Sequence, residues 1–326
     1  MTALLITVDT ELSSSLHQRG VGLDDNVGRS IWAQARGQAF GIGWQMDLLD
    51  RHGLKGVFFL DPLPALVHGP DFLAPIVGAI VGRGHEVQMH IHTEWLAWAN
   101  PSPVGDRRGR NIGDFSLADQ VVLLGQAKQL LEDAGAPAIT AFRAGNFGAN
   151  DDTLRALAAL GVAWDSSVNP AYLGRECAIS VDRAQIGAVR RHGVAELPVS
   201  GIADRPSGFR PAQICAMSAA EMHAGLRHAV REGHDAFVVV THSFEMLSRD
   251  RQRPNHAVIA RFESLCREAA RLPAVRGVGF NDLPTDMADR PARALTRAAP
   301  SQWRTGLRIA QQAWVTWRYE RRLVPA

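Results

Sequence analysis

The chain of 326 residues has few cysteines and no long apolar run. Its three cysteines, Cys177, Cys215 and Cys266, include no Cys-x-x-Cys spacing, so the sequence predicts neither a disulfide framework nor a zinc knuckle. That usage is typical of a reducing compartment. No segment approaches the roughly 18 apolar residues that a membrane span needs. Residues 3–8 form an apolar run too short for a signal peptide, so we expect a cytoplasmic protein.

Charge is divided unevenly along the chain. The formal net charge of +2 gives no indication of nucleic-acid binding, and we expect no nucleic-acid partner. Residues 290–326 hold eight Arg and one Glu, whereas residues 1–289 hold 27 basic and 32 acidic residues. With 46% hydrophobic content, the chain of 326 residues can build a large core, as one large domain or as two modest ones. We therefore expect a mildly acidic globular body, residues 1–289, followed by a basic tail, residues 290–326.

The most informative stretch is residues 85–94 (HEVQMHIHTE), which is predicted to be a short strand after a helix that ends in glycine. Side chains alternate between faces along a strand, so His90 and His92 should point the same way, with Glu94 in step behind them. Imidazoles and a carboxylate on one face could form half of a first-row metal site. The alternative is one exposed histidine and one core histidine bonded to a carbonyl.

Strand and helix signals alternate along the body. Predicted strands cover residues 4–8, 56–60, 139–142, 162–164, 196–200, 236–240 and 278–280, whereas residues 12–30 read as a polar segment. Predicted helices include 117–134, 151–160, 219–232 and 257–272, several of them opened by capping residues such as Ser116 and Asn150. Repeated strand–helix units favour an α/β fold with a parallel barrel or open sheet.

Polar or ionisable side chains follow five of these strands. They are Asp9 and Glu11, His90 and His92, Arg143, Asp165, and His242. In parallel α/β barrels the active site lies at the C-terminal ends of the strands, so we expect these side chains to share one pocket. The alternative is that they are ordinary polar loop residues.

The order of these motifs resembles the polysaccharide deacetylase (NodB-homology) family, carbohydrate esterase family 4. Residues 7–11 (TVDTE) resemble its first motif, 84–90 (GHEVQMH) the lead-in to its second, 142–148 (FRAGNFG) its third, and 239–242 (VVTH) its fifth. The helix and strand over 152–167 match the elements that follow the third motif. The resemblance covers roughly residues 3–285 and implies a distorted (β/α) barrel of seven or eight strands, with residues 1–289 as the catalytic domain.

Several departures from the family pattern affect the metal site. The first motif usually has two adjacent Asp residues, a general base and a metal ligand, but Thr10 follows Asp9 here. In relatives that space the two acids by one residue, the register makes Asp9 the base and Glu11 the ligand. The second motif usually reads His-x-x-x-His, and its last position is Glu94 here, with His92 between.

The resemblance therefore implies a divalent metal held by Glu11, His90 and either His92 or Glu94. Zn²⁺ is the expected ion, with Co²⁺, Ni²⁺ or Mn²⁺ as alternatives. In the third motif Gly145 and Asn146 replace the usual Pro and Tyr, which alters the wall of the pocket.

These residue types suit amide hydrolysis. A divalent metal with three protein ligands lowers the pKa of bound water to about 7 and polarises a carbonyl. Asp9 would accept the proton of the water, and His242 would protonate the departing amine. Arg143 is suited to orienting a carboxylate, that of Asp9 or Asp165. The alternative role for Asp165 is to cap a turn by bonding to Ser167.

The resemblance implies removal of an N-acetyl or other acyl group from an amino sugar in glycan biosynthesis. The substrate would be an amino-sugar-containing glycan or a lipid-linked or nucleotide-linked sugar. Trp95, Trp98 and the long loop over 98–114 suit sugar stacking and favour this function. One alternative is an allantoinase-like amidase on a small nitrogen compound, with or without a metal. The other is a non-catalytic glycan-binding protein with a degenerate site.

The basic tail lies outside the resemblance. Ser301 is predicted to cap an amphipathic helix from Gln302 to about Arg322. Its apolar stripe consists of Trp303, Leu307, Ala310, Trp314 and Trp317, with Arg on the other faces. This composition is typical of a helix lying in a membrane interface, here at the inner face. The alternative is that the stripe packs onto the barrel or onto a second copy of the chain.

Overall fold

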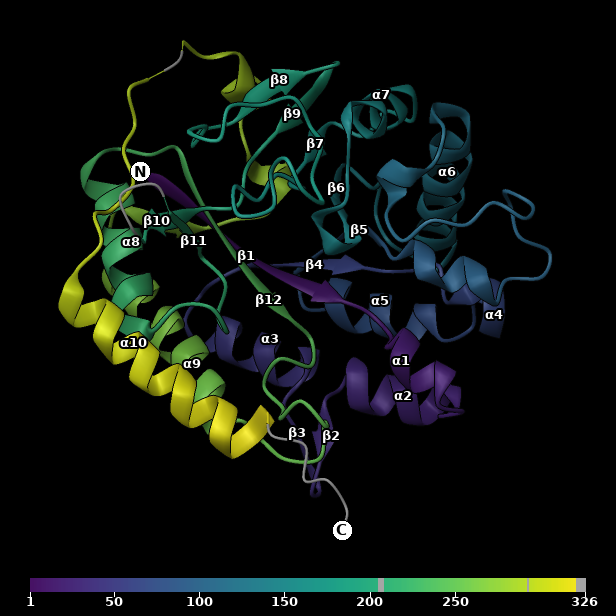
Figure 1. Cartoon of the computed structure of the whole chain (residues 1–326), viewed down its shortest axis with the longest axis horizontal. Coiled ribbons are helices and arrows are strands. Elements are labelled where there is room, and N and C mark those ends of the chain that lie inside the picture. The colour runs from purple at the N-terminus through teal and green to yellow at the C-terminus, as the bar shows by residue number, and fades with distance from the viewer. Residues whose placement is uncertain (205–207, 292, 321–326) are drawn as a thin grey trace.

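The computed structural model describes residues 1–204, 208–291 and 293–320. Its centre is a curled, mainly parallel sheet (Figure 1), in the order β12-β1-β4-β5-β6-β7-β9-β8, with β13 also pairing with β1. These strands are β1 (Thr2–Thr10), β4 (Gly56–Leu60), β5 (Glu86–Ile91), β6 (Ala141–Ala144), β7 (Trp164–Asp165), β8 (Val189–Arg191), β9 (Val194–Glu196), β12 (Ala236–His242) and β13 (Val275–Gly277). Only β8 and β9 pair antiparallel among the pairings of this sheet that the structure describes.

Two short hairpins lie outside this sheet, and ten α-helices are described. The hairpins pair β2 (Gln34–Ala35) with β3 (Gln38–Ala39) and β10 (Gly201–Ala203) with β11 (Phe209–Pro211). The helices are α1 (Ser14–Gln18), α2 (Leu23–Ser30), α3 (Ile42–Arg51), α4 (Ala65–His68), α5 (Leu73–Val81), α6 (Leu117–Asp133), α7 (Asp151–Ala159), α8 (Ala219–Arg231), α9 (His256–Arg271) and α10 (Gln302–Val315).

The central strands are buried on both faces, which is why their sequences are continuous apolar runs. Every residue of β4 and β5 is buried, and β1 has a single half-buried residue. Beyond β12, irregular backbone extends the sheet: the Ser200 N–H donates to the Val238 carbonyl (3.2 Å) and the Ile214 N–H to the Val240 carbonyl (3.1 Å). The curled sheet with its surrounding helices confirms the prediction of a distorted (β/α) barrel.

The register of the sheet brings the ends of distant strands level. Asp9 on β1 pairs with His242 on β12, and His90 on β5 pairs with Arg143 on β6. Because these strands are parallel, their C-terminal ends meet at one edge of the sheet. The polar residues that follow the apolar runs are therefore gathered although up to 233 positions separate them in sequence.

The sequence analysis was wrong about two segments. The final strand is Val275–Gly277, which pairs with the first residues of β1, whereas Phe280 begins a short 3₁₀-helix and inserts its ring into the core. Residues 12–30, for which the sequence predicted a polar segment and no helix, hold α1 and α2. Both helices are short and carry few apolar residues, so their periodicity is weak.

The capping predictions for α6, α7 and α8 are confirmed. The Ser116 hydroxyl accepts from the Asp119 N–H, and Asn150 and Ser218 accept from the N–H of the third residue of α7 and α8. Each cap satisfies a backbone donor that the first turn of the helix leaves unpaired.

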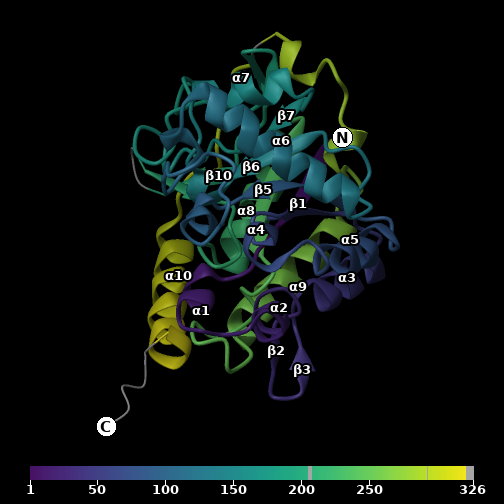
Figure 2. The same ribbon diagram turned by 90° about the vertical axis from the view of Figure 1, so that its right-hand side faces the viewer.

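Helix α10 lies along the outside of α8 (Figure 1, Figure 2). An ordinary surface helix turns its apolar side toward the protein, but α10 turns its apolar side toward solvent. Its polar side faces inward, because the buried Arg308 guanidinium bonds Glu221 (2.9 Å) and Asp204 (2.8 Å). Trp303, on the stripe side, is 88% exposed. Ser301 precedes α10 without a side-chain cap, and the last predicted residues of this helix, to Arg322, lie outside the described residues.

The predicted stripe is therefore largely exposed, and the alternative in which it packs onto the barrel is wrong. Trp314 is 49% and Trp317 58% exposed, and Leu307 is 47% exposed. The side chains that face the barrel instead of this stripe are Arg308, Val315 and Tyr319. Within the described parts of the chain, no helix combines the length and the apolar character needed to cross a membrane.

Candidate active site

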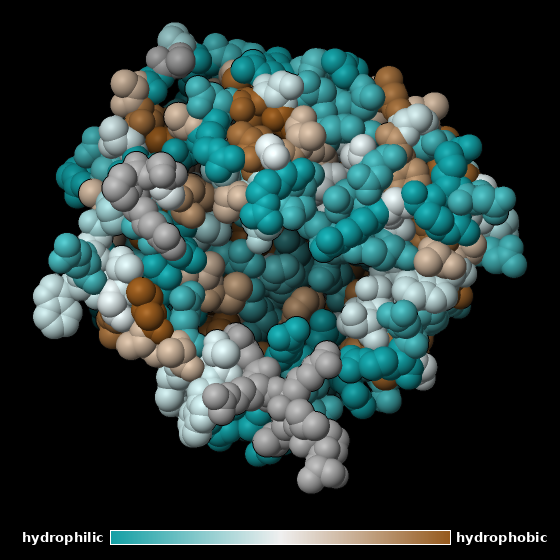
Figure 3. Space-filling model, viewed as in Figure 1, coloured by the Kyte–Doolittle hydropathy of each residue, from teal (hydrophilic) through white to brown (hydrophobic). Residues whose placement is uncertain are grey.

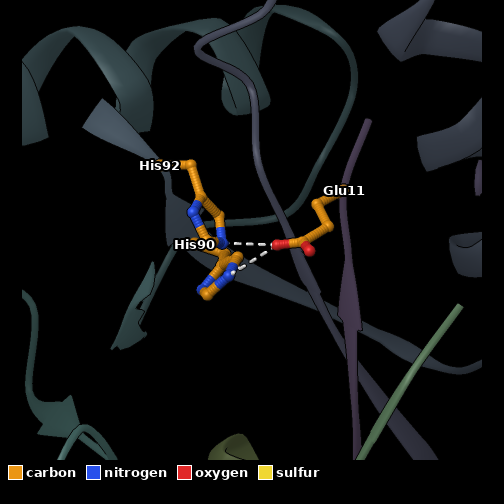
Figure 4. A group of neighbouring side chains, drawn as sticks. All are labelled: Glu11, His90 and His92. Carbon is orange, nitrogen blue, oxygen red and sulfur yellow. Dashed lines mark ion pairs between the residues drawn. The ribbon is translucent and has the colours of Figure 1, made fainter. Parts of the chain in front are cut away.

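Glu11, His90 and His92 form a group that could hold a metal ion (Figure 4). The Glu11 Oε2 atom lies 3.3 Å from His90 Nε2 and 2.5 Å from His92 Nε2, and one ligand atom from each residue lies within 4.8 Å of the other two. Glu11 follows β1, and both histidines come from β5 and the residue after it. A carboxylate and two imidazoles match the donor set of catalytic zinc sites, which leave a further position open.

Both histidines are held with their Nε2 atoms toward this group. His90 Nδ1 donates to the Arg143 carbonyl (2.6 Å), because a carbonyl can only accept. His92 Nδ1 is bonded to Glu94 Oε2 at 3.1 Å. An outer acceptor at Nδ1 fixes the ring orientation and leaves Nε2 for a metal. The side chains present therefore fit a metal ion.

Glu94 is not one of the residues around the potential metal position; it bonds His92 at Nδ1, the ring nitrogen that points away from Glu11. The extended backbone continues through His92, and Thr93 then begins a 3₁₀-helix that ends the alternation of side chains. Glu94 also accepts from Asn146 Nδ2 at 3.1 Å. The group that surrounds the potential metal position is thus Glu11, His90 and His92, and Glu94 supports the last of these.

Gly145 makes room for this arrangement. A Cβ atom at this position would lie 2.9 Å from the His92 ring and 2.5 Å from the Ile91 carbonyl oxygen. The side chain of any other residue would displace the histidine or the strand. Asn146, the next residue, has a positive φ of 56°, and its amide reaches Glu94. Gly145 and Asn146, which depart from the third motif, therefore accommodate His92 and Glu94, which depart from the second.

Arg143 and Asp9 form a buried ion pair beside the Glu–His–His group. Arg143 Nη1 donates to Asp9 Oδ1 (2.8 Å) and to Thr7 Oγ1 (2.7 Å), and Arg143 Nε donates to the Ser166 carbonyl (3.2 Å). The Arg143 side chain is fully buried over the Phe59 ring, 4.4 Å from its centroid. Burial would raise the pKa of Asp9, but the positive charges of Arg143, His90 and His242 lower it below its usual value.

His242 faces Asp9 from the neighbouring strand. Its Nε2 lies 4.0 Å from Asp9 Oδ2, and its Nδ1 lies 3.2 Å from Glu245 Oε1. Burial disfavours the imidazolium, yet the hydrogen bond and charge of Glu245, with the charges of Asp9 and Glu11, raise the pKa of His242 to about 9. His242 is therefore protonated at neutral pH, the state required of a general acid.

Asp165 is placed apart from this group. Its carboxylate accepts from the Ser167 N–H (3.1 Å) and hydroxyl (2.7 Å), the turn-capping arrangement, and it lies level with Glu196 on β9. Burial, with the neighbouring Asp165 charge, raises the pKa of Glu196 well above its usual value. The two carboxyls form a buried acidic pair behind Arg143, and Arg143 bonds Asp9 instead of Asp165.

Sequence reasoning missed three acidic residues near the site. Asp61 follows β4, and burial raises its pKa to about 7 against the lowering effect of His92 and His90. The others are Glu196 and Glu245, the latter bonded to His242. The sequence could have indicated Asp61, since this residue directly follows an apolar strand, as Asp9 ends one. It could not have indicated Glu245, because only the turn after β12 brings this carboxylate back to the His242 ring.

The predicted sugar-stacking role of Trp95 is not supported. Trp95 is fully buried, because the 3₁₀-helix after β5 turns it into the core. Its ring packs against His17, His68 and Trp98 at centroid distances of 5.2 to 5.9 Å. Trp98 is half-buried and in edge contact with His17.

Comparison with known proteins identifies the fold. No protein-family model and no curated protein sequence matches the chain. A solved structure from Mycobacterium smegmatis, provisionally assigned as a polysaccharide deacetylase, is similar with a TM-score of 0.57 at 17% identity, over 91% of this chain and 94% of that one. At this identity the likeness shows the fold, which is the one implied by the motif resemblance.

Two further solved structures match with lower scores. The family 4 carbohydrate esterase from Streptomyces lividans has a TM-score of 0.43 at 12% identity, over 92% of this chain and 97% of that one. A peptidoglycan N-acetylglucosamine deacetylase has a TM-score of 0.44 at 11% identity, over 91% of this chain and 89% of that one.

The geometry generates a prediction for metal binding. Replacing His90 or His92 by Ala should remove most of the bound Zn²⁺, because two remaining ligands provide neither the charge nor the geometry of three. Glu94→Gln should retain the metal with an affinity about 10–100-fold lower, since it removes an outer partner of His92. Equilibrium dialysis against Zn²⁺ measures both effects.

The exposed His256, at the start of α9, provides the matched control. His256→Ala should bind Zn²⁺ like the unaltered protein. Undiminished binding in both His90→Ala and His92→Ala would show that the metal is held elsewhere.

Proposed function

We propose that the protein is a metal-dependent hydrolase that removes an N-acetyl or related acyl group from an amino sugar. One observation carries the proposal: Asp9 and His242 face each other 4.0 Å apart, next to the Glu11–His90–His92 group, at the C-terminal edge of a sheet of the polysaccharide deacetylase type. In this proposal residues 1–289 form the catalytic domain and residues 290–326 a separate tail.

A divalent metal bound by Glu11, His90 and His92 would supply polarisation of the acyl carbonyl and of the attacking water. Asp9 Oδ2, left free by Arg143, accepts the proton that the water loses. Arg143 keeps Asp9 ionised, and its fixed guanidinium orients the carboxylate. His242 Nε2 donates its proton to the amine nitrogen as the amide C–N bond breaks. Asp165, with Glu196, maintains the buried surroundings of Arg143 and takes no part in proton transfer.

Two alternatives remain testable. An allantoinase-like amidase would use the same Asp9 and His242 without needing the Glu11–His90–His92 group. A non-catalytic glycan-binding protein would need neither. The opposing protonation states of Asp9 and His242, one ionised and one protonated at neutral pH, support an enzyme, since such pairs are arranged for acid–base catalysis.

The first functional prediction concerns the acid and the base. Asp9→Asn and His242→Ala should each lower kcat for an N-acetylated amino-sugar substrate by a factor of about 10²–10⁴. Circular dichroism should show that both variants are folded. His256→Ala, an exposed histidine, should leave kcat unchanged. Turnover close to that of the unaltered enzyme in either site variant would contradict the assigned roles.

The second concerns pH. Because His242 acts in its protonated form, kcat should fall as the pH rises through about 9, the raised pKa of this residue. Glu245→Gln removes the main partner that raises this pKa, so the alkaline limb of the pH–kcat profile should move to lower pH. An unchanged limb in Glu245→Gln would show that another group governs it.

We also propose that α10 contacts an anionic membrane surface. Trp303 and Trp314 of α10 and Trp317 just after it are exposed and can enter a lipid interface. Arg304 and Arg318 lie on the same segment, whereas Arg308 faces inward. Further cations gather at its C-terminal end, where the Arg253 guanidinium donates to the Arg318 carbonyl and the Arg249 N–H to the Tyr319 carbonyl. Apolar surface flanked by cations matches an anionic bilayer better than another protein surface.

The membrane proposal predicts that the protein co-sediments with phosphatidylglycerol vesicles at low salt and is released at high salt. Replacing Trp303, Trp314 and Trp317 together by Ser should abolish sedimentation. A matched control replaces Leu117 and Val122, exposed apolar residues of α6, by Ser and should sediment normally. Equal sedimentation of the unaltered protein, the tryptophan variant and the control would contradict the proposal. A dimer in light scattering that is lost in the tryptophan variant would also contradict it, because the stripe would then be covered by a second copy of the chain.

A further inference from the structure

A cavity of about 1270 Å³ lies next to the residues that follow His242 and is lined on another side by part of α10. Phe244 and Glu245 line it at one end, and both contact His242, by rings 5.4 Å apart and by the 3.2 Å contact to Nδ1. Val315 and Tyr319 of the α10 segment line it at the other end. On the face viewed in Figure 3 the molecule has a deep central hollow with mainly hydrophilic walls. The cavity exceeds the usual size of small-ligand pockets, so it has room for more than one sugar ring.

Arg261 is a buried cation in the wall of this cavity that lacks a carboxylate partner. It is 6% exposed. Its Nη1 donates to the carbonyls of Ile214 (3.3 Å) and Cys215 (3.0 Å), while its Nη2 is buried without a hydrogen-bond partner among the described residues. Within those residues, no carboxylate lies within 4.0 Å of its guanidinium. Glu245 and Glu221 act on Arg261 only from a distance, so a ligand that bonds Nη2 would add a direct counter-charge to the buried guanidinium.

Arg251 is a second cation in the same wall. Its guanidinium lies over the Phe244 ring, 3.9 Å from the centroid, and bonds the Ser30 hydroxyl. Among the described residues it too has no carboxylate within 4.0 Å. Its backbone has a positive φ of 57°, a conformation that costs free energy in a residue with a side chain and is concentrated at functional sites. The chain thus holds Arg251 in a strained position beside the cavity.

The rest of the lining leaves this positive charge uncompensated. Arg19 and Arg249, both exposed, add two more guanidinium groups. The acidic lining residues are Glu245, engaged by His242, and Asp250, which accepts from the Ser248 hydroxyl (2.5 Å). Four arginines thus line the cavity together with two carboxylates, of which Glu245 is engaged by His242, so positive charge is in excess.

We infer that this cavity binds a phosphate or pyrophosphate group, through Arg251 and Arg261, and that the acylated sugar of the proposed substrate is attached to that group and reaches His242. Planar guanidinium forks match the oxygens of a phosphoryl group, which offers more acceptors than a carboxylate. The sugar part of this inference rests on the proposed function, whereas binding of the anion does not. The substrate is accordingly a phosphate-linked amino sugar instead of a neutral polysaccharide.

Isothermal titration with inorganic pyrophosphate tests the anion site separately from catalysis. The protein is titrated both with Zn²⁺ and after EDTA treatment, so that binding to a metal is distinguished. Arg251→Gln and Arg261→Gln should each raise the Kd of the EDTA-treated protein at least about tenfold. Arg267→Gln, an exposed arginine of α9 outside the cavity, is the matched control and should bind like the unaltered protein.

Pyrophosphate binding that is absent, or is equal in all four proteins, overturns the inference. Thermal melting checks that Arg261→Gln is folded, and Arg251→Gln alone decides the outcome if it is not. Uridine diphosphate and farnesyl pyrophosphate are titrated in parallel. Tighter binding of uridine diphosphate than of pyrophosphate indicates a nucleotide-linked sugar, and tighter binding of farnesyl pyrophosphate indicates a lipid-linked sugar. Should N-acetylated sugars not be turned over while pyrophosphate still binds through these arginines, the proposed reaction fails and the anion site stands.

Discussion

The buried ion pair between Arg143 and Asp9 is the interaction on which the rest of the site depends. The Arg143 guanidinium fixes the carboxylate on β1, and its backbone carbonyl accepts from His90 Nδ1 on β5. One residue of β6 thus orients the proposed base and a potential metal ligand from two other strands. Breaking a buried pair of this kind by removing one partner typically costs about 3–5 kcal/mol, because the other charge remains buried. The site and the sheet are therefore stabilised by the same contacts.

The departures from the family motifs are connected in space. Glu11 reaches His92, His92 is supported by Glu94, and Glu94 accepts from Asn146. Gly145 leaves the space that the His92 ring occupies. Each change taken singly weakens the resemblance, but together they form one series of contacts, an ion pair followed by two hydrogen bonds. The residues that depart from the family motifs thus contact one another instead of being scattered over the fold.

The α10 helix links the cavity to the outer surface. Its inward side is held by the buried Arg308 pairs and, at Val315, lines the cavity, while its outward side exposes tryptophans. A helix placed only for stability would bury its apolar side, since that burial supplies most of the free energy of packing. Here ion pairs determine the orientation instead. The arginine-lined cavity and the exposed apolar stripe thus lie on opposite sides of the same helix.

The sequence by itself determined the α/β class, the caps of the main helices and the polar residues at the strand ends, because periodicity and strand polarity are local properties. It could not determine which acid Arg143 bonds, since only the register of β1 against its neighbours brings Asp9 within 2.8 Å. Nor could it choose between His92 and Glu94, because the choice depends on where the extended backbone ends. The same holds for α10: its periodicity reveals two faces, but only the partners Glu221 and Asp204, distant in sequence, decide that the polar one faces inward.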